Sequence, residues 1–245
     1  MEKQIDGQFV KWMEQGFAEL KLTLTGVQME QFWKFYELLI EWNQVMNLTA
    51  ITDMDAVVSK HFVDSCALVK SGIPMEGQKL MDVGTGAGFP GIPLKILFPD
   101  LRVTLLDSLN KRIRFLDEVC SQLGLQNVEL IHGRAEDYGR DTHYREQYDL
   151  CVSRAVANLS SLSEYCLPFV KVGGYFIPYK SGKVEEERIE AEGAVTKLGG
   201  KIEQIYSFHL PPEDALRYLV MIEKVKGTAK KYPRKAGMPA KEPLK

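Results

Sequence analysis

The strongest constraint on the fold is a short glycine-rich segment. Residues 82–91 read Asp-Val-Gly-Thr-Gly-Ala-Gly-Phe-Pro-Gly and overlap an apolar run, 79–83, that is typical of a buried strand. Glycines let a chain turn sharply and bring its amides close to a ligand, at the carboxyl edge of a parallel sheet. The segment therefore predicts a strand, a ligand-binding loop and a helix, which Pro90 and Pro93 can begin.

Further short apolar runs predict the rest of a sheet. They lie at residues 103–106, 128–131, 150–152 and 174–178. Helical patterns separate or follow them, at residues 111–123, 159–170 and 185–198. This alternation predicts an α/β fold with a mostly parallel, seven-stranded sheet and helices on both faces. Two late runs, 202–209 and 217–224, are expected to close the sheet as a hairpin, which suits a class I methyltransferase Rossmann-like fold better than a classical dinucleotide fold.

The chain before the glycine segment reads as helical. Apolar residues recur at helical spacing over residues 9–70, until Gly72, Pro74 and Gly77 interrupt the pattern. We therefore predict three parts: an N-terminal helical extension at 1–72, the ligand-binding α/β domain at 73–226 and a basic tail at 227–245.

Composition excludes several classes of protein. No stretch is apolar over the length of a membrane span, and the first twelve residues carry four charges. The four cysteines lie far apart without a Cys-x-x-Cys pair, which indicates neither a zinc site nor a disulfide framework. We expect a cytoplasmic monomer without membrane or metal.

The net charge of −2 hides an uneven distribution. Residues 224–245 hold eight Lys or Arg and one acid, Glu242, so this end carries +7 and the remainder −9. A basic terminus that contains Pro and Gly suits contacts to phosphates, although a charge run is often only a solvated face. Candidate RNA-binding residues are Lys230, Lys231, Arg234 and Lys235.

The glycine segment alone is compatible with two ligands. Gly86, Gly88 and Gly91 spell G-x-G-x-x-G, and Asp107 follows Gly86 by 21 residues at the end of the second strand, as in a nicotinamide dinucleotide site. A carboxylate at Asp107 can accept two hydrogen bonds from the ribose hydroxyls of either ligand.

Three features favour S-adenosylmethionine. Asp82 ends the first strand, where it is expected to face a cationic amino group. Ala135 and Glu136 follow the third strand, where methyltransferases of this class hold adenine. The late hairpin is the third feature. Gly84 and Gly86 then belong to the cofactor loop, and Phe89 within that loop is expected to contact the cofactor.

The residues after the fourth strand limit the methyl acceptor. Residues 153–157 read Ser-Arg-Ala-Val-Ala, not the Asn or Asp followed by two prolines that accompanies methylation of an exocyclic amine. The chain has no Pro-Cys pair, which pyrimidine C5 chemistry would need. What remains includes acceptors that need no base, such as guanine N7, for which catalysis is positioning and electrostatics. Arg154 is the candidate positioning residue, with an ordinary ion pair as its structural alternative.

Taken in order, these segments resemble the ribosomal RNA small subunit methyltransferase G family, also called glucose-inhibited division protein B, over nearly the whole chain. The matching residues are 42–43, 46–49, 61, 64–65, 82–93, 107–109, 111–112, 134–136, 153–155, 231–235 and 237. The resemblance implies metal-free methylation of N7 of one guanosine in 16S rRNA, with S-adenosylmethionine as donor. Carried over by position, the implied cofactor contacts are Gly84, Phe89, Asp107, Ser108, Leu109, Ala135, Glu136 and Arg154.

The roles of two groups of polar residues stay open, and two other functions compete with the first. His61, Asp64 and Ser65 share one helical face and can serve either a site or a network that ties the extension to the core, and the same holds for Asn43 and Asn47. A nicotinamide oxidoreductase and a non-catalytic RNA-binding protein are the competing functions. If residues 230–245 only contact RNA, their removal should weaken RNA binding and leave cofactor affinity unchanged.

Overall fold

A computed structural model describes residues 5–210 and 215–245; residues 1–4 of the predicted extension, and 211–214 between the last two strands, lie outside it. Seven strands form one sheet in the order β3-β2-β1-β4-β5-β7-β6. Their bounds are β1 (Lys79–Val83), β2 (Arg102–Asp107), β3 (Val128–His132), β4 (Tyr148–Arg154), β5 (Val170–Lys180), β6 (Gly200–Leu210) and β7 (Ala215–Lys224).

The direction of the strands matches the prediction. β3, β2, β1, β4 and β5 pair in parallel. β7 pairs antiparallel with both β5 and β6, so it alone runs against the others. The order reverses between β1 and β4, because the chain leaves β1 towards β2 on one side and returns to β4 on the other. Ligands of such sheets bind in the crevice at the carboxyl ends of the strands beside this reversal.

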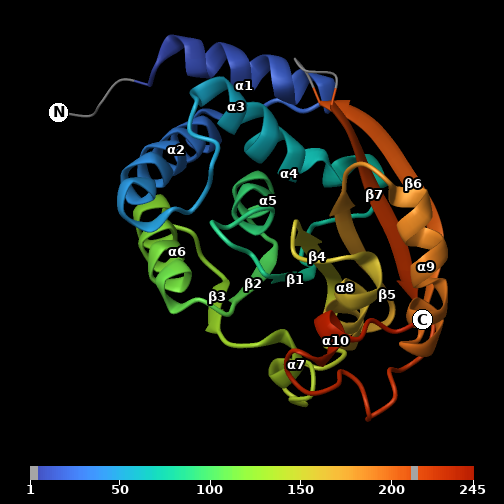
Figure 1. Cartoon of the computed structure of the whole chain (residues 1–245). Coiled ribbons are helices and arrows are strands. Elements are labelled where there is room, and N and C mark those ends of the chain that lie inside the picture. The colour runs from blue at the N-terminus through green and yellow to red at the C-terminus, as the bar shows by residue number, and fades with distance from the viewer. Residues whose placement is uncertain (1–4, 211–214) are drawn as a thin grey trace.

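Helices cover both faces of the sheet (Figure 1). Their bounds are α1 (Gly7–Glu19), α2 (Gly26–Met46), α3 (Met54–Val57), the π-helical turn η1 (Val58–Val63), α4 (Asp64–Cys66), the 3₁₀ turn η2 (Ala67–Ser71), α5 (Gly91–Leu97), α6 (Asn110–Leu123), α7 (Ala135–Tyr138), α8 (Leu159–Cys166), the 3₁₀ turn η3 (Leu167–Phe169), α9 (Val184–Lys197) and α10 (Met238–Lys241). Helices α1, α2, α5 and α6 lie on one face, and α8, α9 and α10 lie on the other.

Local sequence explains several boundaries. Asp6 caps α1 by accepting hydrogen bonds from the amides of Gln8 and Phe9. Thr25 and Gln28 form a capping box at the start of α2. The predicted helix 159–170 is too long: α8 ends at Cys166 and the apolar run continues through η3 into β5. The single helical stretch predicted over 9–70 is instead two long helices and a series of short turns.

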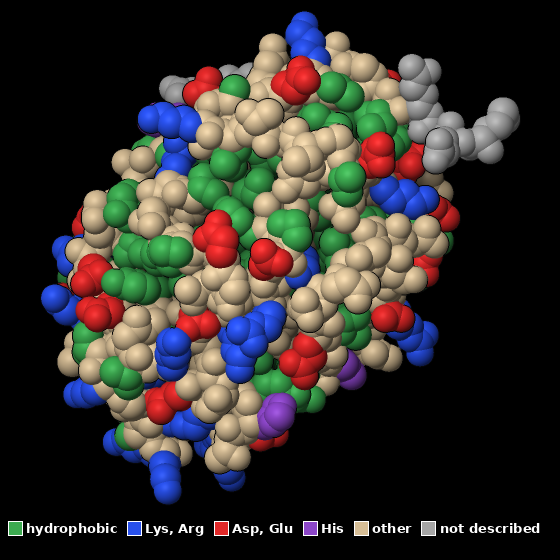
Figure 2. Space-filling view, turned by 180° about the vertical axis from the view of Figure 1, so that it is seen from behind, with side chains coloured by type: hydrophobic (Ala, Val, Ile, Leu, Met, Phe, Trp, Pro, Cys, Tyr) green, Lys and Arg blue, Asp and Glu red, His purple; other side chains and the backbone are tan. Residues whose placement is uncertain are grey.

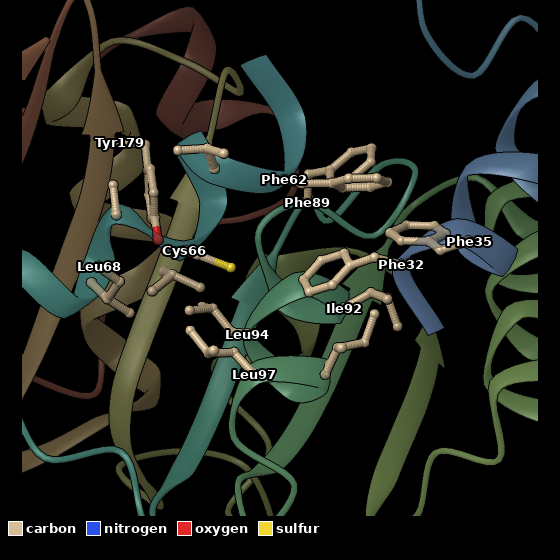
Figure 3. Packing of buried hydrophobic residues seen from close by; sticks show 14 of the residues in the cluster. Phe32, Phe35, Phe62, Cys66, Leu68, Phe89, Ile92, Leu94, Leu97 and Tyr179 are labelled. Atoms are coloured by element: carbon tan, nitrogen blue, oxygen red, sulfur yellow. The ribbon is translucent and has the colours of Figure 1, made fainter. Parts of the chain in front are cut away.

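The N-terminal helices share one hydrophobic core with the sheet. Phe32 and Phe35 of α2 and Phe62 of η1 meet Phe89 of the glycine segment, as Figure 3 shows. The rings of Phe35 and Phe89 lie 5.2 Å apart, and those of Phe35 and Phe62 lie 5.6 Å apart. The core therefore continues from the N-terminal extension into the α/β domain, and the extension packs against the glycine segment.

Candidate functional site

The glycine segment turns at the carboxyl end of β1. Gly84 has a φ of +71°, which favours glycine, and its amide donates a hydrogen bond of 2.8 Å to the carbonyl of Leu106 at the end of β2. A Cβ at Gly84 would lie 2.6 Å from Cγ2 of Val156, which follows β4. Only glycine therefore lets the loops after β1 and β4 approach this closely.

Asp107 ends β2 as a fixed, inward carboxylate that is 2% exposed. Its Oδ2 accepts a hydrogen bond of 2.9 Å from the amide of Gly86, and its Oδ1 accepts one of 2.9 Å from the amide of Leu109. Arg112 forms an ion pair with it at 3.2 Å. These three partners orient the carboxylate at the reversal of strand order.

Asp82 differs from its expected place. The sequence placed its carboxylate facing a ligand, but the side chain is fully buried beneath the loop. Its Oδ2 accepts hydrogen bonds from the hydroxyl of Thr85 at 2.7 Å and from the amide of Gly91 at 2.9 Å. Burial raises its pKa to about 7, while these two hydrogen bonds and the charge of Arg154 oppose that rise. Asp82 therefore orders the glycine segment from below.

Two hollows open at the carboxyl ends of the strands and share Asp107 between them. The first hollow measures about 500 Å³ and is lined by Val83, Gly84, Leu106, Asp107, Ser108, Gly133, Arg134, Ala135, Glu136, Val156 and Tyr165. The second hollow measures about 900 Å³ and is lined by Leu48, Thr49, His61, Gly84, Thr85, Gly86, Ala87, Phe89, Asp107, Ser108, Arg112, Arg154, Ala155 and Val156. Most of the predicted cofactor residues therefore meet around one groove.

Arg154, His61 and Phe89 form a stack at the far wall of the second hollow. The rings of His61 and Phe89 lie 4.5 Å apart, and the guanidinium carbon of Arg154 lies 5.1 Å from the centre of the Phe89 ring. Burial, followed by the charge of Arg154, lowers the pKa of His61 to about 3. The histidine ring is therefore neutral at physiological pH.

The ion pair proposed as the structural alternative for Arg154 is present. Its Nη1 donates a hydrogen bond of 2.8 Å to Oδ2 of Asp64 and one of 2.9 Å to the carbonyl of Lys60. The same guanidinium borders the second hollow, so the ion pair and a place in the site occur together. Asp64 and His61 therefore serve both as a tie to the extension and as part of the groove wall.

A third hollow of about 980 Å³ lies beyond this stack. It shares His61, Arg154 and Ala155 with the second hollow and continues to Ile51, Lys60, Asp64, Ala157, Leu162, Tyr179, Lys180, Ser181, Glu187 and Arg217. The three hollows thus form a continuous series along one edge of the sheet. A separate hollow of about 730 Å³ opens at the amino ends of β1 to β4, the edge at which sheets of this kind do not hold their ligands.

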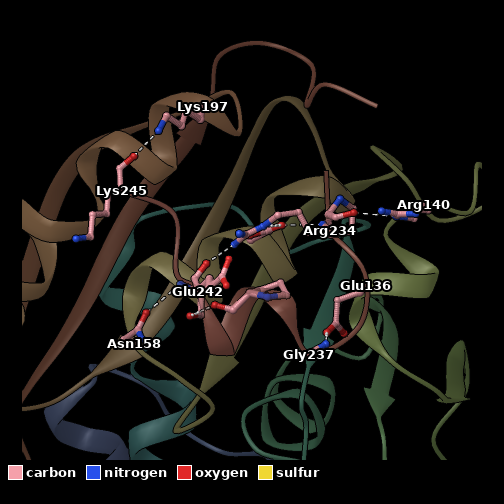
Figure 4. A network of polar contacts seen from close by, with 12 residues as sticks. Glu136, Arg140, Asn158, Lys197, Arg234, Gly237, Glu242 and Lys245 are labelled. Carbon is pink, nitrogen blue, oxygen red and sulfur yellow. Dashed lines mark hydrogen bonds and ion pairs between the residues drawn. The ribbon is translucent and has the colours of Figure 1, made fainter. Parts of the chain in front are cut away.

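The C-terminal segment folds back onto α7 and α8 instead of extending as a free tail. Glu136, 3% exposed, accepts a hydrogen bond of 2.8 Å from the amide of Gly237 (Figure 4). Arg234 forms an ion pair of 2.7 Å with Glu164, which is fully buried in α8. Arg140 donates to the carbonyl of Pro233 at 2.8 Å. Glu136 therefore lines the first hollow and also binds the C-terminal segment, more than a hundred positions later in the sequence.

The four predicted RNA-binding residues divide into two groups. Lys230, Lys231 and Lys235 are exposed, whereas the guanidinium of Arg234 is engaged by Glu164. Figure 2 shows Lys and Arg side chains gathered along its lower edge, the side on which Figure 1 places α7, α10 and the chain after β7. The exposed Lys230, Lys231 and Lys235, here called the basic surface, are available to a partner, and Arg234 belongs to the packing of the segment.

Sequence reasoning missed several residues of the groove. Val156 and Tyr165 line the first hollow, and Arg112 pairs with Asp107, yet none was among the predicted site residues. Arg112 could have been found, because five residues after a strand-ending acid it stands one helical turn into α6. Val156 and Tyr165 carry no signal of their own. Among the described residues, no group of three potential metal ligands occurs and no helix is long and apolar enough to cross a membrane.

Solved structures from other organisms superpose on this fold. A SAM-dependent methyltransferase from Aquifex aeolicus superposes with a TM-score of 0.52 at 19% identity, over 69% of this chain and 93% of that one. TrmN from Thermus thermophilus gives 0.51 at 15% identity, over 68% of this chain and 53% of that one. The fold is therefore that of the class I methyltransferases, which confirms the predicted fold class.

The family follows from closer relatives. The model of the GidB family, rRNA small subunit methyltransferase G, matches residues 28–216. The ribosomal RNA small subunit methyltransferase G of Lachnoclostridium phytofermentans is 57% identical over 230 residues, 94% of this chain and 95% of that protein. That of Thermoanaerobacter sp. strain X514 is 53% identical over 235 residues, 96% and 98% of the two chains. The chain belongs to the rRNA small subunit methyltransferase G family, as its resemblance predicted.

Proposed function

We propose that this protein is a cytoplasmic, monomeric S-adenosylmethionine-dependent methyltransferase that methylates N7 of a guanosine in 16S rRNA of the small ribosomal subunit. The observation that carries the proposal is the position of Asp107. Its carboxylate is fixed at the end of β2, beside the reversal of strand order, and lines both the first and the second hollow. A ribose at Asp107 would direct a base into one hollow and an amino-acid group into the other.

The residues around the groove fit S-adenosylmethionine. Ala135, Glu136 and Ser108 line the first hollow, where adenine would lie, and the amide of Leu109 helps to hold Asp107. Gly84, Gly86 and Phe89 line the second hollow, where the methionine part would lie, with Asp82 supporting the loop beneath it. The cofactor supplies an electrophilic methyl group on a positively charged sulfur.

The walls of the second hollow suit such a cation. Phe89 contributes an aromatic ring that His61 and Arg154 contact, His61 is neutral, and the charge of Arg154 is balanced by Asp64. Guanine N7 has a lone pair and no proton, so transfer to it needs orientation and no general base. Arg154 is proposed as the residue that positions the acceptor, and no residue is assigned as an acid or a base.

The basic surface supports an RNA substrate. Lys230, Lys231 and Lys235 are free to approach phosphates, whereas Arg234 acts by holding the C-terminal segment to Glu164. We propose that these lysines contact the rRNA backbone, with Arg234 as an indirect contributor.

The test is incubation of the purified protein with labelled S-adenosylmethionine and small ribosomal subunits from a strain that lacks the enzyme, followed by nucleoside mass spectrometry. Label in 7-methylguanosine that is lost with Asp107→Ala supports both the chemistry and the cofactor site. Label on another nucleoside would refute the N7 assignment. Absence of label, with binding of reduced nicotinamide or of RNA alone, would favour the oxidoreductase or the non-catalytic function.

A further inference from the structure

The third hollow lies where a methyl acceptor would have to enter. It meets the second hollow at His61, Arg154 and Ala155. An acceptor in the third hollow would face the methyl donor across Arg154. Most of the charged residues in its wall are cations, and Asp64 is the one deeply buried acid among them. The free hydrogen-bonding capacity of Asp64 therefore bears on what the hollow can bind.

Only one of the two carboxylate oxygens of Asp64 accepts a hydrogen bond from a described residue. The side chain is 4% exposed, and Oδ2 accepts the hydrogen bond of 2.8 Å from Arg154. Within residues 5–210 and 215–245, Oδ1 has no hydrogen-bond partner. Nε of Arg217 forms an ion pair with Oδ1 at 3.6 Å, beyond hydrogen-bond distance. A buried carboxylate oxygen without a donor is costly, and a ligand that supplies an N–H would remove that cost.

We propose that Asp64 is a specificity-determining residue, whose Oδ1 accepts hydrogen bonds from N1–H and the 2-amino group of the acceptor guanine in the third hollow. This inference rests on the proposed function. On a purine, N7 belongs to the five-membered ring, and the N1 and N2 donors lie on the far edge of the six-membered ring. A guanine that turns N7 towards the second hollow therefore turns its donor edge into the third.

Arg217 is the residue that the base displaces. Its side chain is about a quarter exposed, and its Nε lies 3.6 Å from Oδ1 of Asp64. A long arginine side chain can move aside while Arg154 keeps Oδ2 in place. The entering N–H groups then replace a poor ion pair with two direct hydrogen bonds.

A carboxylate at this position also suits the chemistry of the step. The lone pair of N7 forms the new bond to carbon, the electron pair of the breaking C–S bond returns to sulfur, and no proton leaves. The purine therefore becomes positively charged, which strengthens N1–H and the 2-amino group as donors. Asp64 thus binds the charged product-like base more tightly than the neutral one, as transition-state stabilisation requires.

The experiment replaces one group on each side of the proposed contact. Small subunits are reconstituted with guanosine or inosine at the methylated position, because inosine lacks only the 2-amino group. The proteins are the wild type, Asp64→Asn and Asp149→Asn, the last an ion-paired aspartate at the start of β4, remote from the groove. An asparagine at position 64 can keep its oxygen towards Arg154, which leaves an N–H₂ group where Oδ1 accepted.

We expect inosine to lower kcat/KM roughly ten- to hundredfold for the wild type and for Asp149→Asn. For Asp64→Asn the guanosine-to-inosine ratio should fall to within about threefold of one, because the contact is already lost. An unchanged ratio in Asp64→Asn, together with normal wild-type methylation, would overturn the inference and leave the proposed function intact. Absence of methylation by the wild type would instead refute the proposed function.

A second measurement keeps the test decisive when Asp64→Asn turns over slowly or is unstable. Affinity for S-adenosylhomocysteine shows whether Asp64→Asn retains its folded cofactor site. If turnover is too slow to measure, the same ratio is taken from equilibrium binding of the two kinds of particle in the presence of S-adenosylhomocysteine. If Asp64 has a structural role that acts only through Arg154, Asp64→Asn would weaken binding of both particles by the same factor and keep the wild-type ratio between them. That result would also overturn the inference.

Discussion

Asp82 and Asp107 lie at the carboxyl ends of neighbouring strands and are both buried, yet their partners give them different roles. Asp107 meets two amides and a guanidinium at the edge of the groove. Asp82 lies one layer deeper, where Oδ2 accepts from Thr85 and Gly91 and, among the described residues, Oδ1 has no partner. The first carboxylate is therefore available to a ligand, and the second stabilises the loop that surrounds the ligand.

The buried position of Asp82 predicts a dependence of stability on pH. The unfolded chain releases this proton near pH 3.8, whereas the folded chain holds it until about pH 7. Between these values the folded state binds more protons, so the free energy of unfolding falls as the pH rises. Asp82→Asn cannot titrate, and we expect the wild type to lose roughly 2 kcal/mol relative to it between pH 5 and pH 7. Urea denaturation of both proteins measures this, and a pH-independent difference would contradict the assignment.

Asp107 makes a different prediction, on ligand affinity. Asp107→Asn removes the charge and places a donor where a ribose hydroxyl would donate, so S-adenosylhomocysteine should bind roughly ten- to a hundredfold more weakly. Titration calorimetry measures the dissociation constant, and Asp149→Asn serves as the matched control. Equal affinity in all three proteins would show that the ribose lies elsewhere.

At the scale of elements, the C-terminal segment is held to α8 by an ion pair with a buried acid. Arg234→Ala leaves the carboxylate of Glu164 buried without its cation, and we expect a loss of about 3–5 kcal/mol in the free energy of unfolding. Glu164→Gln in the same chain should restore part of that loss, because the amide can be buried uncharged. Chemical denaturation of the three proteins decides, and an unchanged stability of Arg234→Ala would mean that the segment is not anchored here.

Because the C-terminal segment is anchored, its removal would affect more than contacts to RNA. Removal of residues 230–245 takes away Arg234, the partner of Glu136 at Gly237 and the buried ring of Tyr232. Such a chain loses packing next to the first hollow as well as positive charge. Weakened cofactor binding after truncation would therefore not argue against RNA contacts by the lysines, and point substitutions are the sharper experiment.

The sheet was predictable because buried strands are short apolar runs between turn signals. The expected strand 79–83 coincides with β1, and the late hairpin is present as β6 and β7. The end of α8 was not predictable, because residues 167–170 stay apolar while the chain passes through η3 into β5. A run of buried residues carries no period that separates a helix from a turn and a strand.

The site was predictable where loops follow strands and not where distant segments meet. Gly84, Asp107 and Ala135 follow three successive strands, so their meeting at one edge follows from a parallel sheet. The contact of Glu136 with Gly237 and that of Glu164 with Arg234 join residues far apart in sequence, and the charge of the tail gave no sign of either. The burial of Asp82 was missed because the sequence indicates that this residue lies near the end of a strand. It does not indicate in which direction the side chain points.

For the molecule as a whole, only part of the positive charge of the C-terminal segment lies at the surface. Some of the positive charge counted from residue 224 onward is internal: Lys224 is buried, and burial lowers its pKa to about 8. Arg234 is paired with Glu164. The remaining exposed cations act against an otherwise acidic body, which should orient the protein towards a polyanion and keep the rest of its surface away from it.

This distribution predicts the salt dependence of binding to small ribosomal subunits. Replacement of Lys230, Lys231 and Lys235 with alanine removes up to three phosphate contacts, so the slope of log affinity against log salt should shrink by about two to three. Affinity for S-adenosylhomocysteine should stay as it is, because none of the three lines the first or second hollow. The matched control replaces Lys11, Lys21 and Lys70, exposed lysines of the N-terminal region, with alanine. Equal slopes for the two triple variants would mean that net charge, and not this surface, attracts the RNA.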